Sequence, residues 1–252
     1  MLAMLLVGSA GLPGVVQSQA AEIKWSPRVG QEWTYECESG APGWATSWFY
    51  FHVANTLTIR IEAVTEELVT IKYTNKVTLA GTGKGQSFDA EPETELRQYK
   101  RNGEPIGETD YFPTSLARTG AYGSYSGFTY PNKLYHAGTS WGVEVSDTSR
   151  TPPEIRAAGH SWDYTGTLIS TFVGFEKVGE VDCWKIAYRS LGLDGRQVIE
   201  NAGTAWLDKR DGSIVRVKEG ERPPSFDIWN DEVLSKMSGY CDMRLVASAK
   251  QV

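Results

Sequence analysis

The sequence is poor in the residues that most enzyme sites are built from. Its 252 residues include only three histidines and three cysteines. A Gly-x-Ser-x-Gly elbow is absent, because the nearest segment, 123–127, has Tyr125 at its centre. His-x-x-x-His, Cys-x-x-Cys and Asp-rich calcium loops are absent as well. The sequence therefore predicts no catalytic residue, no metal site and no cofactor.

The histidines leave one enzymatic alternative open. His160 is followed by Ser161 and Asp163, but neighbouring residues of a strand point to opposite faces and cannot form a triad among themselves. A hydrolase would instead need His136 or His160 to meet an Asp or Glu in a cleft. Whether the chain is an enzyme stays open at this point, with the balance against it.

The chain also lacks any run of basic residues. Its formal net charge is -6 and its pI is near 5.2, so its surface repels phosphate backbones and nucleic acid is not an expected partner. With 40% hydrophobic and 22% charged residues, the composition is that of a globular chain. No segment after Ala20 is apolar enough to span a membrane.

Residues 1–20 differ from the rest of the chain. An apolar stretch ends near Val16, and Ser18 and Ala20 then provide small residues at positions -3 and -1. This pattern predicts a signal peptide cleaved after Ala20, and therefore a periplasmic or extracellular protein. A membrane anchor is the weaker reading, because glycines and Pro13 interrupt a run too short to cross a bilayer.

Export places the three cysteines in an oxidising compartment. An odd number leaves at least one of them outside an intramolecular bridge. Cys37 and Cys241 lie near the two ends of the mature chain, and we predict a disulfide between them. Cys183 lies in a strand-like run, where a buried and inert thiol is the expectation.

An internal repeat is the most informative feature of the sequence. Gly-x-x-Trp occurs at Gly30 and again at Gly138, and Thr-Leu pairs begin at Thr56 and Thr167. Lys-Arg-Asn-Gly ends at 103 and Lys-Arg-Asp-Gly ends at 212. Asn-Gly and Asp-Gly favour tight hairpins. The three landmarks recur in the same order and at nearly one spacing, which predicts two copies of one β unit.

Hydrophobic residues alternate with polar ones over 57–63, 68–73 and 183–188, as expected for strands with one buried face. The predicted fold is mainly β, an antiparallel meander that forms either one large curved sheet or two similar halves. One short helix is expected at 226–237, and a last strand at 242–246. The expected units are residues 21–112, a Tyr/Gly/Ser-rich connection at 113–130, residues 131–222, and a C-terminal segment, 223–252.

Aromatic residues are the remaining signal, with nine Trp, twelve Tyr and eight Phe. Most aromatic residues of a β protein fill its core, but they also line apolar clefts. The aromatic residues form two clusters, and the one in the Tyr/Gly/Ser-rich connection lacks strand alternation. From these clusters we predict the residues that contact a ligand: Trp44, Trp48, Tyr122, Tyr125 and Tyr130.

The segment 179–186 (GEVDCWKI), followed by Trp206 and by 212–216 (GSIVR), resembles secreted bacterial β-proteins of the TapB-like kind. The resemblance covers mainly 131–218, with an echo in 27–103. It implies an exported antiparallel β-fold akin to half-barrels that carry lipoproteins, and it implies no catalytic residue.

Curved sheets commonly hold apolar ligands in their concavity. The sequence therefore favours an exported, non-catalytic binding protein for an apolar or amphipathic ligand, such as a lipid. A structural or interaction module of the cell envelope is the first alternative, and a carboxylate/His-dependent hydrolase is the second. The sequence does not indicate an oligomeric state.

Overall fold

The computed structural model describes residues 20–42, 50–81, 91–106, 129–147, 157, 164–194, 197–221 and 240–249. This part of the chain is mainly β, as predicted. Its strands are β1 (Ala20–Ile23), β2 (Glu32–Pro42), β3 (Tyr50–Val64), β4 (Leu68–Gly81), β5 (Glu93–Lys100), β6 (Lys133–His136), β7 (Ser140–Asp147), β8 (Tyr164–Val178), β9 (Val181–Asp194), β10 (Gln197–Asp208), β11 (Ile214–Glu219) and β12 (Tyr240–Ala249).

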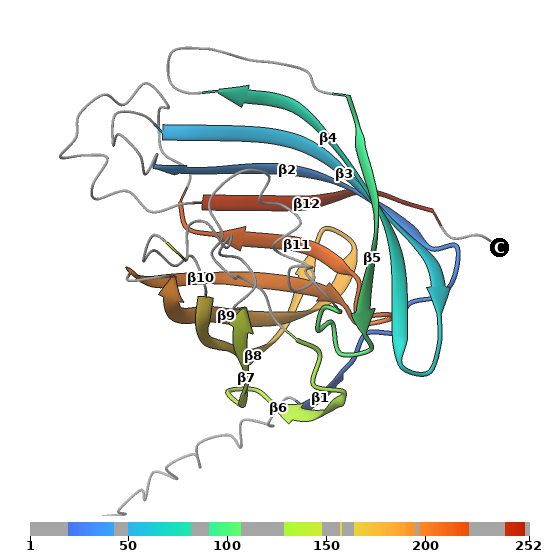
Figure 1. Ribbon diagram of the computed structural model, residues 1–252. Helices are drawn as coiled ribbons and strands as arrows, with labels where there is room; N and C mark the ends of the chain where they lie inside the picture. The colour runs from blue at the N-terminus through green and yellow to red at the C-terminus, as the bar shows by residue number, and fades with distance from the viewer. Residues whose placement is uncertain are drawn as a thin grey trace, which may run out of the picture.

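Ten of these strands form one antiparallel sheet in the order β5-β4-β3-β2-β12-β11-β10-β9-β8-β7. The sheet curves strongly from β5 at one edge to β7 at the other, and the two-stranded sheet of β1 and β6 lies beside it (Figure 1). Of the two architectures that the sequence allowed, the single large curved sheet is the one observed. The two repeats do not fold into separate sheets.

The repeat is visible in the backbone geometry. The amide of Gly30 donates to the carbonyl of Ile61 at 2.9 Å, and at the equivalent position of the second repeat the amide of Gly138 donates to Phe172 at 2.7 Å. Both glycines have positive φ, 83° and 88°. A register shift follows each acceptor residue, between Ile61 and Ala63 in β3 and between Phe172 and Gly174 in β8. The first strand pair of each unit thus carries the same opening turn and the same bulge.

The two predicted hairpins are also present. Gly103 and Gly212 have φ values of 83° and 76°, the left-handed conformation that glycine adopts without a steric penalty. The amide of Gly103 donates to Lys100 at 2.9 Å, and the amide of Gly212 donates to Asp208 at 2.8 Å. The Asn-Gly and Asp-Gly signals therefore located both turns correctly.

The inner face of the large sheet carries the main hydrophobic core. Leu57, Ile59 and Ile61 of β3 are buried there, as the alternation predicted. Ala63 is exposed instead, because the bulge after Ile61 changes the phase of the strand. Strands across the whole sheet contribute to this core: Tyr35, Val69, Ile71, Tyr73, Phe172, Trp184, Ile186, Ala205, Leu207, Val217 and Met243.

Strand β12 joins the two repeats. It pairs with β2 on one side, where Met243 faces Cys37, and with β11 on the other, where Met243 faces Val217. A last strand was expected at 242–246 and is observed over Tyr240–Ala249. The predicted signal peptide, the helix expected at 226–237 and most of the 113–130 connection lie outside the described residues.

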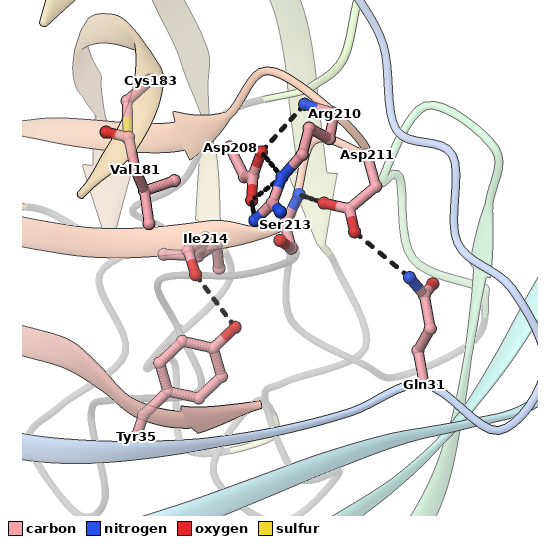
Figure 2. Close-up of polar contacts among 9 residues, drawn as sticks. All are labelled: Gln31, Tyr35, Val181, Cys183, Asp208, Arg210, Asp211, Ser213 and Ile214. Carbon is pink, nitrogen blue, oxygen red and sulfur yellow. Dashed lines mark hydrogen bonds and ion pairs between the residues drawn. The ribbon is translucent and has the colours of Figure 1, made fainter. Parts of the chain in front are cut away.

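The segment before β2 is fastened to the β10–β11 hairpin by buried polar contacts (Figure 2). The Asp211 carboxylate accepts hydrogen bonds from Gln31 Nε2 at 3.1 Å and from the Ser213 amide at 2.9 Å. The amide of Ser26 donates to the Asp211 carbonyl at 2.7 Å. Tyr35 donates its hydroxyl hydrogen to the carbonyl of Ile214 at 3.2 Å. We call this group of contacts the hairpin clasp.

Candidate binding site

Of the five predicted ligand residues, four lie outside the described residues: Trp44, Trp48, Tyr122 and Tyr125. Tyr130 is described, and its ring is buried and stacked on Trp25 with centroids 5.8 Å apart. Its amide donates to Asn102 at 2.7 Å and its hydroxyl donates to the carbonyl of Gly212 at 2.8 Å. Tyr130 thus connects the two equivalent hairpins, and a ligand role for it stays a prediction.

The structure brings Cys37 and Cys241 to neighbouring strands, on the same inner face. Cys241 faces Ser39 and Cys37 faces Met243, so the two cysteines are diagonal neighbours. Diagonal β-carbons are about 7–8 Å apart, whereas a disulfide holds them at about 3.5–4.5 Å. All three cysteines of the chain are buried thiols in the structure, so the predicted bridge is not formed there.

Cys183 lies in a small cluster on the outer face of the sheet, with Trp206 and Val215. Burial raises the pKa of its thiol to about 11, and the nearby Asp208 carboxylate adds to that shift. A thiol with such a pKa is a weak nucleophile at neutral pH. The expectation of a buried, inert cysteine is therefore consistent with its surroundings.

A hollow of about 390 Å³ lies over the centre of the large sheet, where β12 joins the repeats. Strand alternation directs most of the charged side chains that line it to the outer face, away from the hydrophobic core, and Glu219 is the exception. The hollow is lined by Glu36, Cys37, Glu38, Ala54, Asn55, Thr56, Lys218, Glu219, Gly220, Tyr240, Cys241, Asp242 and Arg244. We call it the central pocket.

One aromatic residue, Tyr240, lines the central pocket, and its ring stacks on that of His52. Tyr240 faces Gly40, and Gly40 faces His52 on the next strand. Because Gly40 has no side chain, the two rings stack across it, with centroids 6.4 Å apart and planes inclined by 17°. Tyr240 is only 3% exposed. Ala54, with its small side chain, forms part of the floor.

The floor of the central pocket contains a charged group centred on Asp242. Its carboxylate accepts hydrogen bonds from Arg216 Nη2 at 3.1 Å and from Arg244 Nε at 3.1 Å. Partial burial would raise the pKa of Asp242, but the hydrogen bonds from Arg244 and Arg216 outweigh it and lower that pKa below its usual value. Asp242 is therefore ionised at neutral pH and holds both guanidinium groups.

This arrangement leaves two charged residues of the pocket without a side-chain hydrogen bond or ion pair among the described residues. Lys218 faces Asp242 across β11 and β12, and Glu36 faces Arg244 across β12 and β2. Since Arg216 and Arg244 both bond to Asp242, neither Lys218 nor Glu36 makes a side-chain hydrogen bond or ion pair within the described ranges. The central pocket thus offers one cation and one anion to a ligand.

A buried carboxylate lies on the other face of the same strands. Glu219 of β11 accepts a hydrogen bond from the Tyr188 hydroxyl at 2.7 Å. The phenol reaches it across Gly203 of β10, where an added β-carbon would lie 2.5 Å from the Tyr188 oxygen. Sequence reasoning missed this pair, although a lone glutamate ending an alternating Val-x-Val-x-Glu pattern was a usable signal.

The described residues show no catalytic constellation around histidine. His52 is part of the ring stack, and His136 is exposed on β6. His160 lies outside the described residues, so the hydrolase alternative stays a prediction. In the ranges described, no group of three or more His, Cys, Asp or Glu side chains is placed to hold a metal ion. Nor does any helix there have the length and hydrophobicity to cross a membrane.

Comparisons with known proteins add one similarity. No protein-family model matches the chain, and no curated protein matches it. Among solved structures, it is similar to a predicted exported protein with a YmcC-like fold from Bacteroides fragilis NCTC 9343. The sequence identity is 14% and the TM-score is 0.35, over 90% of this chain and 100% of that one.

Proposed function

We propose that the protein is an exported, non-catalytic binding protein for an amphipathic ligand, and that the central pocket holds the polar part of that ligand. The observation that carries the proposal is the pocket itself, a hollow of about 390 Å³ with the aromatic ring of Tyr240 and the charged residues Lys218 and Glu36 in its lining. Export rests on the leader-like segment 1–20.

The size and the chemistry of the central pocket support this function. Small-molecule sites in proteins are hollows of roughly 300–1,000 Å³ that combine aromatic surface with a few placed polar groups. The ring of Tyr240 can contact the apolar part of a ligand, while Lys218 and Glu36 can bind charged groups. A ligand with both kinds of surface uses every part of the pocket.

Native mass spectrometry of the mature protein, isolated from the envelope fraction of cells that express the full sequence, tests the proposal. We expect a bound mass that is lost on denaturation. Ala54→Trp fills the floor of the pocket and should abolish the bound mass. Ala187→Trp is the matched control, because Ala187 lies on the outer face of β9, away from the pocket, and this variant should retain it.

Two results would reject the function: a wild-type protein with no bound mass, or equal retention of the mass by both Trp variants. Circular dichroism of each variant must match the wild type, so that loss of the ligand is not confused with loss of the fold.

An interaction module of the envelope is the alternative that one observation favours. Strand β5 is an edge of the large sheet, and its Leu96 is 67% exposed. Exposed edges can pair with another chain, but charged residues on the strand oppose this, and Glu93 and Glu95 lie on β5. This alternative predicts a concentration-dependent oligomer that Leu96→Lys abolishes.

A further inference from the structure

The charges of the central pocket are divided between its two sides. On the outer face, strands β11 and β12 carry Lys218 and Arg244 in the lining and Arg216 beside it, against the carboxylate of Asp242. The Glu219 side chain of β11 points to the opposite face, toward Tyr188. Strand β2 carries Glu36 and Glu38 on the same face and no basic residue. One side of the pocket is therefore net positive and the other net negative.

Strand pairing fixes this division. Lys218 faces Asp242, and Asp242 faces Glu38, so the three side chains follow one row across β11, β12 and β2. Neighbouring strands lie about 4.8 Å apart, so the backbones at the two ends of the row are about 10 Å apart. Flexible Lys and Glu side chains can close on a group smaller than that distance.

From this arrangement we infer that the ligand carries a zwitterionic head group, with an ammonium and an acidic phosphate or carboxylate. The ammonium lies at Glu36, on the β2 side, and the acidic group lies at Lys218, on the β11 side. This inference deepens the proposed function and rests on it. A purely anionic ligand would meet Glu36 and Glu38, and a purely cationic ligand would leave Lys218 unpaired.

The bonds that Asp242 makes to Arg216 and Arg244 explain why the pocket favours a ligand that carries both a positive and a negative charge. Asp242 bonds to Arg216 and Arg244, so its carboxylate is not left to bind Lys218. Lys218 and Glu36 are exposed, so a contact with either one reaches the about 1.5–3 kcal/mol of a charge-assisted hydrogen bond when the bound ligand shields it from water. Loss of either ligand contact should therefore weaken binding by about tenfold or more.

Isothermal titration below the critical micelle concentration tests the inference, with protein stripped of bound lipid and three single-chain probes of equal chain length. Lysophosphatidylethanolamine is zwitterionic, lysophosphatidylglycerol is anionic and an alkylamine is cationic. We expect the zwitterion to bind at least tenfold more tightly than either of the others. Soluble phosphoethanolamine forms a fourth arm. Binding of that probe alone would identify a free head group as the ligand, and binding of the lipid alone would identify a membrane lipid.

Charge-neutralising variants assign the two ends. Lys218→Gln should weaken binding of the zwitterionic lipid and leave binding of the alkylamine unchanged. Glu36→Gln should weaken binding of both probes. Lys72→Gln and Glu144→Gln are the controls, because these residues are exposed and lie outside the pocket. Equal binding of all three lipids, unchanged by the variants, would overturn the inference and leave the proposed function standing. Failure of every probe to bind, with a bound mass also absent from native protein, would overturn both.

Discussion

The two hairpins that end equivalent strands of the repeats share a left-handed glycine but differ in their surroundings. Both carry a glycine with positive φ, Gly103 after β5 and Gly212 after β10. The first hairpin uses Asn102, whose side chain accepts a hydrogen bond from the Glu104 amide at 3.1 Å. The second uses Asp211, which is buried and bonded to Gln31 and Ser213. The segment before β2 thus contacts the second hairpin through Asp211.

The difference shows that a turn signal predicts backbone conformation better than it predicts contribution to stability. At Gly212 an added β-carbon would lie 2.2 Å from the Lys24 carbonyl oxygen, so the covering segment requires glycine for space as well as for φ. Tyr130 touches both turns, through its amide at one and its hydroxyl at the other. It allows the two copies to be tested separately.

The largest effect is expected for Gly212→Ala. A left-handed alanine costs about 1–2 kcal/mol, and the clash with Lys24 adds an overpacking cost of about 1–3 kcal/mol, so we expect a loss of about 3 kcal/mol in the free energy of unfolding. Gly138→Ala is the control, because Gly138 also has positive φ but open space around it. The free energy of unfolding of Gly138→Ala, measured in urea, should fall by about 1 kcal/mol. Equal losses would show that the covering segment does not press on the hairpin.

A smaller effect is expected for Tyr130→Phe. The variant leaves the buried Gly212 carbonyl without its hydroxyl donor, which costs about 1–3 kcal/mol, while the backbone bond from residue 130 to Asn102 remains. Amide hydrogen exchange should accelerate in residues 209–213 and stay unchanged in residues 101–104. Equal acceleration at both hairpins would contradict separate anchoring of the two copies.

The third effect in order of size is a loss of stability at alkaline pH, caused by two buried tyrosines that contact the β10–β11 hairpin. Burial raises the pKa of Tyr35 and Tyr130 well above the usual 10.0, with the Asp211 carboxylate contributing to both shifts. Their stabilisation is complete below pH 10 and is lost as the pH rises further, because only the unfolded chain then releases these protons. Each such tyrosine contributes a slope of about 1.4 kcal/mol per pH unit. Tyr130→Phe should reduce the slope of stability against pH by that amount between pH 10 and 11.5, and an unchanged slope would refute the assignment.

The smallest effect on stability concerns the thiols. Burial raises the pKa of Cys37, on the inner face of the first repeat, and that of Cys183, on the outer face of the second. We expect no thiol to react with a disulfide reagent at pH 8 in the folded protein, and three to react after denaturation without a reductant. A count of one after denaturation would instead establish an intramolecular bridge, such as the one predicted between Cys37 and Cys241.

Local signals made the repeat predictable. The glycines at 30, 103, 138 and 212 mark turns because their left-handed backbone is set by their immediate neighbours, and alternation located β3, β4 and β9 for the same reason. Strand patterns did not predict the pairing of β12 with β2, because it joins segments from opposite ends of the sequence whose patterns fit many partners. Only the bridge predicted between Cys37 and Cys241 brought these two segments together. The central pocket was missed as well, since Lys218, Asp242 and Glu36 converge only once β12 lies between β11 and β2.

The position of β12 also determines when the molecule can finish folding. Strands β2–β5 and β7–β11 are synthesised before β12. Because β12 lies between β2 and β11, the sheet cannot become continuous until the ribosome has synthesised nearly the whole chain. Pairing at such sequence distance is slow to form. For a chain that leaves the cytoplasm unfolded, as the leader-like segment predicts, a late-arriving central strand lengthens the interval in which a translocase can still thread it.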